Sequence, residues 1–172
     1  TMVATDSYRL AVRRTPIESG PAEPVQALIP ARALAEVQRV VGLSGADEVE
    51  LVLTETQGII RAGQVRLTTR LIDGQFPDYR QLIPETFEHD LTLDRAELLG
   101  VITRIAVLAQ RNTPVRLAFS EGQLTVSASS EQLGEGRESV PVPFRGEPLE
   151  IGFNVEFLRA GVEAIEGEEL RR

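Results

Sequence analysis

The sequence carries one structural pattern twice, a helical segment followed by strand-like runs. Pro30 lies in the first turn of the first helical segment, while Asp94 and Asn154 are good N-cap residues for the second and third. The predicted helices are 29–41, 94–111 and 154–167. Because these signals recur at roughly sixty-residue intervals, internal duplication is the first structural hypothesis.

Alternating apolar and polar residues follow the first two predicted helices. The runs 49–55 and 115–121 alternate in the same register, and each precedes a glycine-containing turn and two more strand-like runs. These further runs are 58–62 and 65–71 in the first copy and 123–129 and 134–142 in the second. Strands are also predicted at 90–93 and 149–153. The sequence therefore predicts an α+β fold of duplicated units, each a helix plus antiparallel strands, with the helices on one face of the sheet.

The composition is that of a globular protein with an acidic balance. Of its 172 residues, 42% are hydrophobic and 26% charged, and the net charge is -8. Non-specific DNA-binding proteins usually have a basic balance, so DNA binding requires that the basic residues be segregated on one face. All 18 basic residues are arginine. No apolar run approaches the roughly 18 residues that would span a membrane.

The residues needed for a metal centre or a cofactor site are absent from the sequence. There is no cysteine, and His89 is the single histidine, which leaves nothing for a thiolate or histidine cluster. His89 lies between two acidic residues and is expected to be a solvated linker residue. No glycine-rich phosphate loop or nucleophile motif is present. No metal and no cofactor are expected.

Acid–base catalysis can be imagined only for a few residues near two turns. They are Asp6, Asp73, Asp78, Tyr79 and Arg80. Carboxylates beside Gly, Pro and Ser usually accept hydrogen bonds from nearby backbone N–H groups and so make turns. No catalytic residue is therefore expected, although an enzyme using this group is kept as an alternative.

Two segments resemble the bacterial sliding clamp, the beta subunit of DNA polymerase III. They are residues 5–11 (TDSYRLA) and residues 71–84 (LIDGQFPDYRQLIP). The resemblance implies a DNA clamp fold and a non-enzymatic processivity factor. It implies that 1–73 is the second half of the middle domain, 74–86 a connector and 87–172 a truncated C-terminal domain. Further family domains are expected before Thr1, and more strands after Arg172.

The resemblance also implies a cleft that binds short peptide tails of partner proteins. Its residues here would be Thr5, Ser7, Tyr8, Arg9, Leu10, Pro77, Gln81 and Leu82. Three of these depart from the family's common pattern. Ser7 replaces a glycine, Tyr8 a histidine and Gln81 an arginine, so we expect a shifted peptide preference.

The first helix separates an apolar face from a basic one. Its predicted buried stripe consists of Leu34, Val37 and Val41. Arg32 and Arg39, seven residues apart, share the opposite face. From the residues alone, a solvated face is the plainer interpretation. The resemblance instead implies that Arg32, Arg39 and, from the second helix, Arg111 face DNA.

The second helix has an apolar residue outside its predicted core stripe. That stripe is Leu98, Val101, Ile102, Ile105, Leu108 and Ala109. Val107 falls on the far side, near Arg104. Single exposed apolar residues are common, but the resemblance implies a subunit contact through Val107 and Leu108. Arg104 either pairs across that contact or faces DNA, and both roles stay open.

The implied partners follow from the family's function as a ring dimer. They are duplex DNA held without sequence preference in the ring's hole, a second copy of the chain, the alpha and clamp loader subunits of DNA polymerase III, and other polymerases and repair proteins that carry short peptide motifs. An acidic outer surface would repel DNA from everywhere except the hole. The expected location is the cytoplasm, with no membrane partner. The alternative is a generic α+β protein-interaction module with no DNA role.

Overall fold

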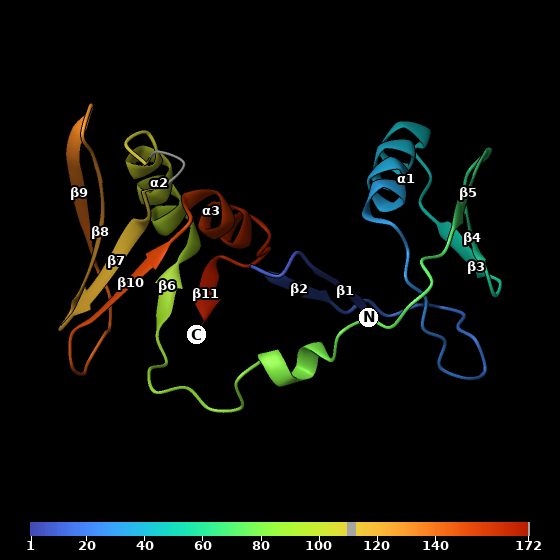
Figure 1. The fold of residues 1–172 in the computed structure, drawn as a ribbon, viewed down its shortest axis with the longest axis horizontal. Helices are drawn as coiled ribbons and strands as arrows, with labels where there is room; N and C mark the ends of the chain where they lie inside the picture. Colours follow the sequence, from blue (N-terminus) through green and yellow to red (C-terminus); the bar gives the residue numbers. More distant parts are fainter. Residues whose placement is uncertain (110–112, 172) are drawn as a thin grey trace. The chain divides into compact units, whose positions relative to one another are not determined.

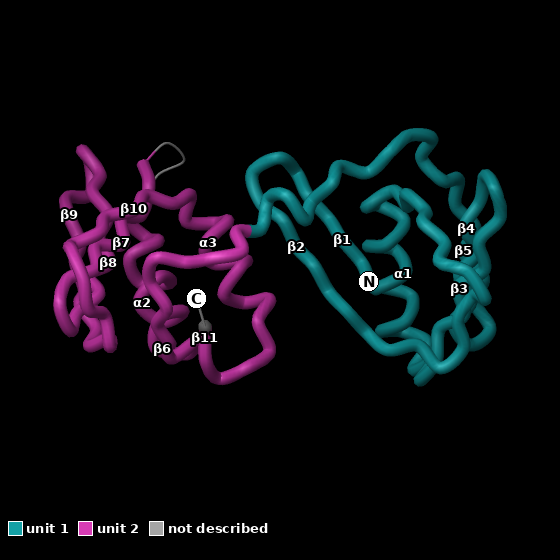
Figure 2. The backbone as a smooth tube through the Cα atoms, turned by 90° about the horizontal axis from the view of Figure 1, so that it is seen from below, with its two compact units in different colours: residues 1–83 teal, residues 84–172 magenta. Residues whose placement is uncertain are grey.

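The computed structural model describes residues 1–109 and 113–171, which form two compact units. Unit 1 comprises Thr1–Ile83 and unit 2 comprises Pro84–Arg172. Figure 2 colours the two units separately. The boundary between them falls inside the segment 74–86, which the sequence marks as a connector.

Unit 1 contains a hairpin, one α-helix, a three-stranded sheet and a short 3₁₀-helix (Figure 1). The elements are β1 (Met2–Thr5), β2 (Leu10–Arg13), α1 (Ala31–Ser44), β3 (Val49–Leu53), β4 (Gln57–Ala62), β5 (Val65–Arg70) and the 3₁₀-helix η1 (Tyr79–Leu82). β1 pairs with β2, and the sheet has the order β3-β4-β5, with all pairs antiparallel. The predicted helix and three strands of the first copy are thus present, while the β1–β2 hairpin was not predicted.

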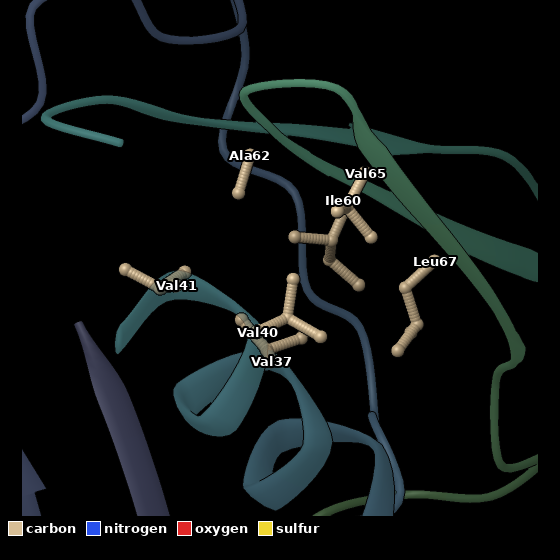
Figure 3. A pocket seen from close by; sticks show the side chains of 7 residues that line it. All are labelled: Val37, Val40, Val41, Ile60, Ala62, Val65 and Leu67. Carbon is tan, nitrogen blue, oxygen red and sulfur yellow. The ribbon is translucent and has the colours of Figure 1, made fainter. Parts of the chain in front are cut away.

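The predicted apolar stripe of α1 faces the sheet. Val37 and Val41 lie opposite side chains of β4 and β5, with Val40 beside them (Figure 3). The small hollow between the two layers is lined by Val37, Val40, Val41, Ile60, Ala62, Val65 and Leu67. Removing this apolar surface from water stabilises the contact by roughly 25 cal/mol per Å². Helix α1 therefore covers one face of its sheet, as the alternation in the sequence predicts.

Unit 2 repeats this arrangement and adds further elements (Figure 1). The elements are β6 (Thr92–Asp94), α2 (Arg95–Ala106), β7 (Val115–Ser120), β8 (Gln123–Ser130), β9 (Gly134–Pro141), β10 (Leu149–Phe153), α3 (Val155–Glu163) and β11 (Glu169–Arg171). The larger sheet has the order β10-β7-β8-β9, and β11 pairs with β6. All pairs are antiparallel, so the α+β assignment is confirmed.

The core of unit 2 joins α2 to the inward face of the larger sheet. Ile102 on α2 and Leu124 and Val126 on β8 are all 0% exposed. Four members of the predicted stripe of α2 are buried, namely Leu98, Val101, Ile102 and Ile105. The last two members, Leu108 and Ala109, are half-buried and pack against this core. The predicted periodicity of α2 is therefore correct.

The predicted ends of α1 and α2 were wrong. Helix α1 continues past Gly42 to Ser44 and ends where Gly45 adopts a left-handed φ of 60°. A glycine in that conformation is a common helix terminator, because it has no Cβ to clash. Helix α2 was expected to reach Arg111 but ends at Ala106. Its last residues tighten into i→i+3 bonds, such as Leu108 N–H to the Ile105 carbonyl at 3.0 Å.

Helix α3 also ends earlier than predicted, and a distant side chain marks its end. It was expected to run to Gly167 but stops at Glu163. The Arg95 guanidinium donates hydrogen bonds to the carbonyls of Val162 and Glu163, both at 3.0 Å. The last carbonyls of a helix have no partner within the helix. Arg95, far away in sequence, supplies one here.

His89 is not the solvated residue that the sequence suggested. It is half-buried, and its ring lies 4.9 Å from that of Phe144, measured between centroids. A Cβ added at Gly146 would stand 3.0 Å from its Cε1 atom. His89 is therefore a packing residue beside the core of unit 2. The acidic neighbours Glu88 and Asp90 suggested a solvated residue, because the sequence near His89 gives no sign of its contact with Phe144, which is distant in the chain.

Candidate functional site

Residues Thr5 to Leu10 form the tight turn between β1 and β2. Thr5 and Leu10 are the last paired residues of the hairpin. Asp6 Oδ1 accepts the backbone N–H groups of Tyr8 and Arg9, both at 3.1 Å, and its Oδ2 accepts Arg9 Nε at 2.9 Å. The Thr5 hydroxyl donates to the Arg9 carbonyl at 2.9 Å. These bonds hold the segment in one conformation.

Ser7, at the tip of this turn, has a left-handed backbone. Its φ of 73° is the only positive value among the described non-glycine residues. Such angles strain a residue that has a Cβ, whereas glycine adopts them freely. This geometry gives a physical reason for the glycine that the resemblance makes common at the position. Ser7 keeps the turn but carries its strain.

The hydrogen bonds of the turn lower the pKa of the Asp6 carboxyl group. Partial desolvation acts to raise its pKa, but the hydrogen bonds from the Arg9 side chain and from the Tyr8 and Arg9 backbones together lower its pKa below the ordinary value of 3.8. Asp6 is thus ionised at neutral pH. The sequence allowed Asp6 to be either a turn-maker or a catalytic residue, and its hydrogen bonds to the backbone of Tyr8 and Arg9 are those of a turn-maker.

The second segment turns at Asp78, which caps η1. Asp78 Oδ1 accepts the Arg80 backbone N–H at 3.3 Å, and Oδ2 accepts the Gln81 side-chain amide at 3.0 Å. The Arg80 guanidinium carbon lies 5.4 Å from the centre of the Tyr79 ring. Both Asp6 and Asp78 therefore use their carboxylates to order local backbone, which favours the turn interpretation over acid–base chemistry.

The two segments present several apolar groups to solvent. Tyr8 is 83% exposed and Leu82 is 65% exposed. Pro77 is exposed, whereas Leu10 is half-buried. The start of the second segment is fastened to unit 1 by backbone bonds from Leu71 and Ile72, at 2.9 and 2.8 Å. That the two segments line one groove stays a prediction.

The two arginines of α1 assigned to DNA are accessible. Arg32 and Arg39 are both exposed, on the side of the helix opposite Val37 and Val41. Arg39 forms an ion pair with Glu36, one turn earlier, in which Nε lies 3.1 Å from Oε2. Hydrogen bonding to Glu36 raises the pKa of Arg39. Arg111 lies outside the described residues.

The end of α2 is fastened to strand β9. Arg104 donates two hydrogen bonds to the Glu138 carboxylate, at 2.8 and 2.7 Å. The bonded Arg104 side chain lowers the pKa of Glu138. Val107, one turn on, is 74% exposed. Arg104 thus has a partner within its own chain that the sequence did not suggest, since Glu138 is 34 residues away. Its assignment to DNA or to a second subunit is unchanged by this contact.

The described residues hold no cluster of three or more metal-binding side chains. Among them there is also no helix with the length and apolar character needed to cross a membrane.

Comparison with known proteins covers almost the whole chain. Residues 1–78 match the family described as "DNA polymerase III beta subunit, central domain", and residues 80–171 match "DNA polymerase III beta subunit, C-terminal domain". The beta sliding clamp of Synechococcus elongatus is 38% identical over 98% of this chain and 46% of its own length. The chain thus spans about half the length of the curated relatives it matches.

Solved structures show the same similarity in three dimensions. The Caulobacter crescentus beta sliding clamp is 32% identical, with a TM-score of 0.88 over 97% of this chain and 44% of that one. The DNA polymerase III subunit beta of Pseudomonas aeruginosa is 31% identical, with a TM-score of 0.88 over 98% of this chain and 46% of that one. Two domain matches, sequence identity above 30% and the shared fold agree: the chain belongs to the DNA polymerase III beta subunit family.

Proposed function

We propose that this chain is part of a beta sliding clamp, a non-catalytic processivity factor that works in the cytoplasm. As a ring dimer the clamp encircles duplex DNA, and it tethers the replicative polymerase and other replication and repair proteins. In this proposal 1–73 belong to the middle domain, 74–86 to the connector and 87–172 to the C-terminal domain. The match of both halves to clamp domains carries the proposal.

The peptide cleft combines apolar and polar groups from the two segments. Leu10, Pro77 and Leu82 supply apolar surface for the hydrophobic anchors of a partner's tail. Thr5, Ser7, Tyr8, Arg9 and Gln81 fix the direction of the tail through polar contacts. The ordered turn around Asp6 supports this role, since a preorganised site loses little entropy when it binds.

Peptide binding by the full-length protein tests the cleft. The probe is a fluorescent peptide with the C-terminal sequence of the same organism's polymerase III alpha subunit. We expect the Leu82→Ala variant to bind about tenfold more weakly, a loss of about 1.4 kcal/mol. Leu133→Ala, at a leucine that is 60% exposed in unit 2, is the matched control. Unchanged binding by a Leu10→Ala, Pro77→Ala double variant removes the cleft assignment.

DNA is held by topology in this proposal, with weak phosphate contacts from Arg32, Arg39 and Arg111. Strong contacts would only slow sliding, so a few exposed arginines suffice. The full-length clamp loaded on circular DNA should be lost when the DNA is linearised. Equal retention on both forms contradicts the ring. Replacing Arg32 and Arg39 with glutamate should reduce loading while leaving tail binding intact.

The subunit contact is assigned to Val107 and Leu108, with Arg104 nearby. Val107 is available for such a contact because most of its side chain is exposed. Size-exclusion chromatography of the full-length protein should show a dimer that a Val107→Asp substitution weakens. A monomeric wild-type protein would favour the generic interaction module instead. Arg104→Gln, in the same assay, reports whether that arginine contributes to the dimer.

A further inference from the structure

The face of the β3–β4–β5 sheet that points away from α1 carries three arginines. Side chains alternate between the two faces of a strand, and Ile60 and Ala62 are buried on the α1 side. Arg61, between them, therefore points to the other face. The register pairs Arg61 with Arg66 and Gln57 with Arg70, which brings Arg66 and Arg70 to the same face. We name the surface formed by Arg61, Arg66, Arg70, Val52, Ile59 and Thr68 the arginine face.

The positive charge of this face is not balanced locally. Glu50 is the only acidic residue in the three strands. It pairs with Arg61, with Arg61 Nη1 and Glu50 Oε2 2.9 Å apart. Arg66 and Arg70 are exposed and have no ion pair with any described residue. Arg61 also lies directly opposite Arg66, and like charges in that position destabilise a sheet.

The repeated sheet of unit 2 serves as an internal comparison. On its corresponding face, Arg116 pairs with Glu150 at 2.5 Å and Arg137 lies 3.6 Å from Glu135. Each arginine there has a carboxylate partner, so the face is balanced. The fold of the repeat therefore does not require an excess of arginine. The excess of arginine is specific to the sheet of unit 1.

The residues between the arginines favour one kind of ligand. Val52 and Ile59 are directly opposite each other, half-buried, and form an apolar centre flanked by guanidinium groups. Sites for single-stranded nucleic acid usually stack bases on aromatic rings, and the three strands contain no aromatic residue. Guanidinium groups bind carboxylates with paired hydrogen bonds. Charge and apolar surface together match an acidic peptide with aliphatic side chains.

We infer that the arginine face is a docking surface for an acidic, aliphatic segment of a partner protein. Carboxylates of the segment bind Arg66 and Arg70, and an aliphatic side chain covers Val52 and Ile59. Filling the face with carboxylates also relieves the repulsion between Arg61 and Arg66. This surface shares no residue with the proposed peptide cleft, so the inference goes beyond the proposed function.

Fluorescence anisotropy with the full-length protein tests the inference. The probe is a short labelled peptide in which glutamates flank a central pair of leucines. We expect binding at low salt that weakens as salt is added, and at least tenfold weaker binding by an Arg66→Gln, Arg70→Gln double variant. An Arg116→Gln, Arg137→Gln double variant is the matched control for loss of charge. Ile59→Ala should weaken the same peptide several-fold.

Each contrary result overturns the inference. These results are no binding by the wild type, unchanged binding by the Arg66 and Arg70 variant, or an equal loss in the control variant. An oligothymidylate that displaces the peptide and binds more tightly assigns the face to nucleic acid instead. The polymerase-tail peptide should bind the Arg66 and Arg70 variant normally, which separates failure of this inference from failure of the cleft.

Discussion

Leu108 lies directly against the backbone of Gly136. A Cβ placed on Gly136 would stand 2.3 Å from Leu108 Cδ1 and 3.4 Å from Ile105 Cδ1. Because Gly136 has no side chain, Leu108, just after the end of α2, can pack close to strand β9. Arg104, four residues before Leu108 and on α2, is hydrogen-bonded to Glu138, two residues after Gly136 on β9. Together the two contacts hold the turn that exposes Val107.

Gly136→Ala is expected to lower the free energy of unfolding. The new methyl group displaces Leu108 from a packed site, and overpacking of this kind costs about 1–3 kcal/mol. Urea unfolding of the full-length protein measures the change. Gly161→Ala is the control, because a Cβ at Gly161 in α3 meets nothing within 4 Å. In a helix that change should be neutral or stabilising. An equal loss in both variants contradicts the packing assigned to Gly136.

The Arg104–Glu138 pair predicts coupling within one chain. Arg104→Gln and Glu138→Gln should be non-additive in urea unfolding of a dimer-deficient Val107→Asp protein, because each removes the same paired bonds. Both side chains are partly exposed, so the coupling should be small and should shrink with added salt. Additive effects in the monomer would show that the pair does not join α2 to β9 in solution.

The elements that the sequence predicts well are those set by local periodicity. The stripe from Leu98 to Ile105 is buried as predicted, because a helix face is determined by spacing along the chain. The alternation in 49–55 and 115–121 was likewise sufficient to identify β3 and β7 as strands. The apolar residues of α1, and the exposure of Arg32 and Arg39, follow from the same reasoning. The local sequence pattern therefore predicts which elements form the helix layer and which form the sheet layer in each unit.

What the sequence misses depends on partners far along the chain. Strand β11 has only three residues and exists through its pairing with β6. The end of α3 is fixed by Arg95, and the environment of His89 by Phe144. At the candidate site, the motif residues came from family resemblance, but Gly136 and Glu138 carried no local signal. The turns at Asp6 and Asp78 did have one, because carboxylates beside Ser and Pro favour side-chain capping of a turn.

Ser7→Gly is expected to stabilise the hairpin. Glycine removes the strain of a φ of 73°, although it loses more conformational freedom on folding. The net gain should be positive and at most about 1 kcal/mol. Ser7→Val should destabilise, because a β-branched residue fits a positive φ poorly. Hydrogen exchange of the β1–β2 amides in the full-length protein measures both changes. A slower exchange in the valine variant than in the glycine variant contradicts the strained turn.

The turn should also become less stable in acid, because protonation of Asp6 removes an interaction that stabilises the folded state. Its pKa in the folded turn lies below the ordinary value of 3.8, so folding favours the charged form. The stabilisation is fully present above pH 3.8 and is lost as the pH falls through the lower folded pKa. A carboxyl titration by NMR should therefore place the Asp6 midpoint below 3.8. An Asp6→Asn variant identifies its resonance and should have hairpin exchange rates that depend less on pH in this range.

The Arg9 side chain contributes to this shift through its hydrogen bond to Asp6 Oδ2. In an Arg9→Gln variant the Asp6 midpoint should rise, and the rise should be limited because the backbone N–H groups of Tyr8 and Arg9 remain as donors. Arg13→Gln, on the neighbouring strand, controls for the loss of one positive charge. If both substitutions move the midpoint equally, long-range charge and not the turn's hydrogen bonds sets the pKa. A wild-type midpoint at or above 3.8 means that the Asp6 turn does not form in solution.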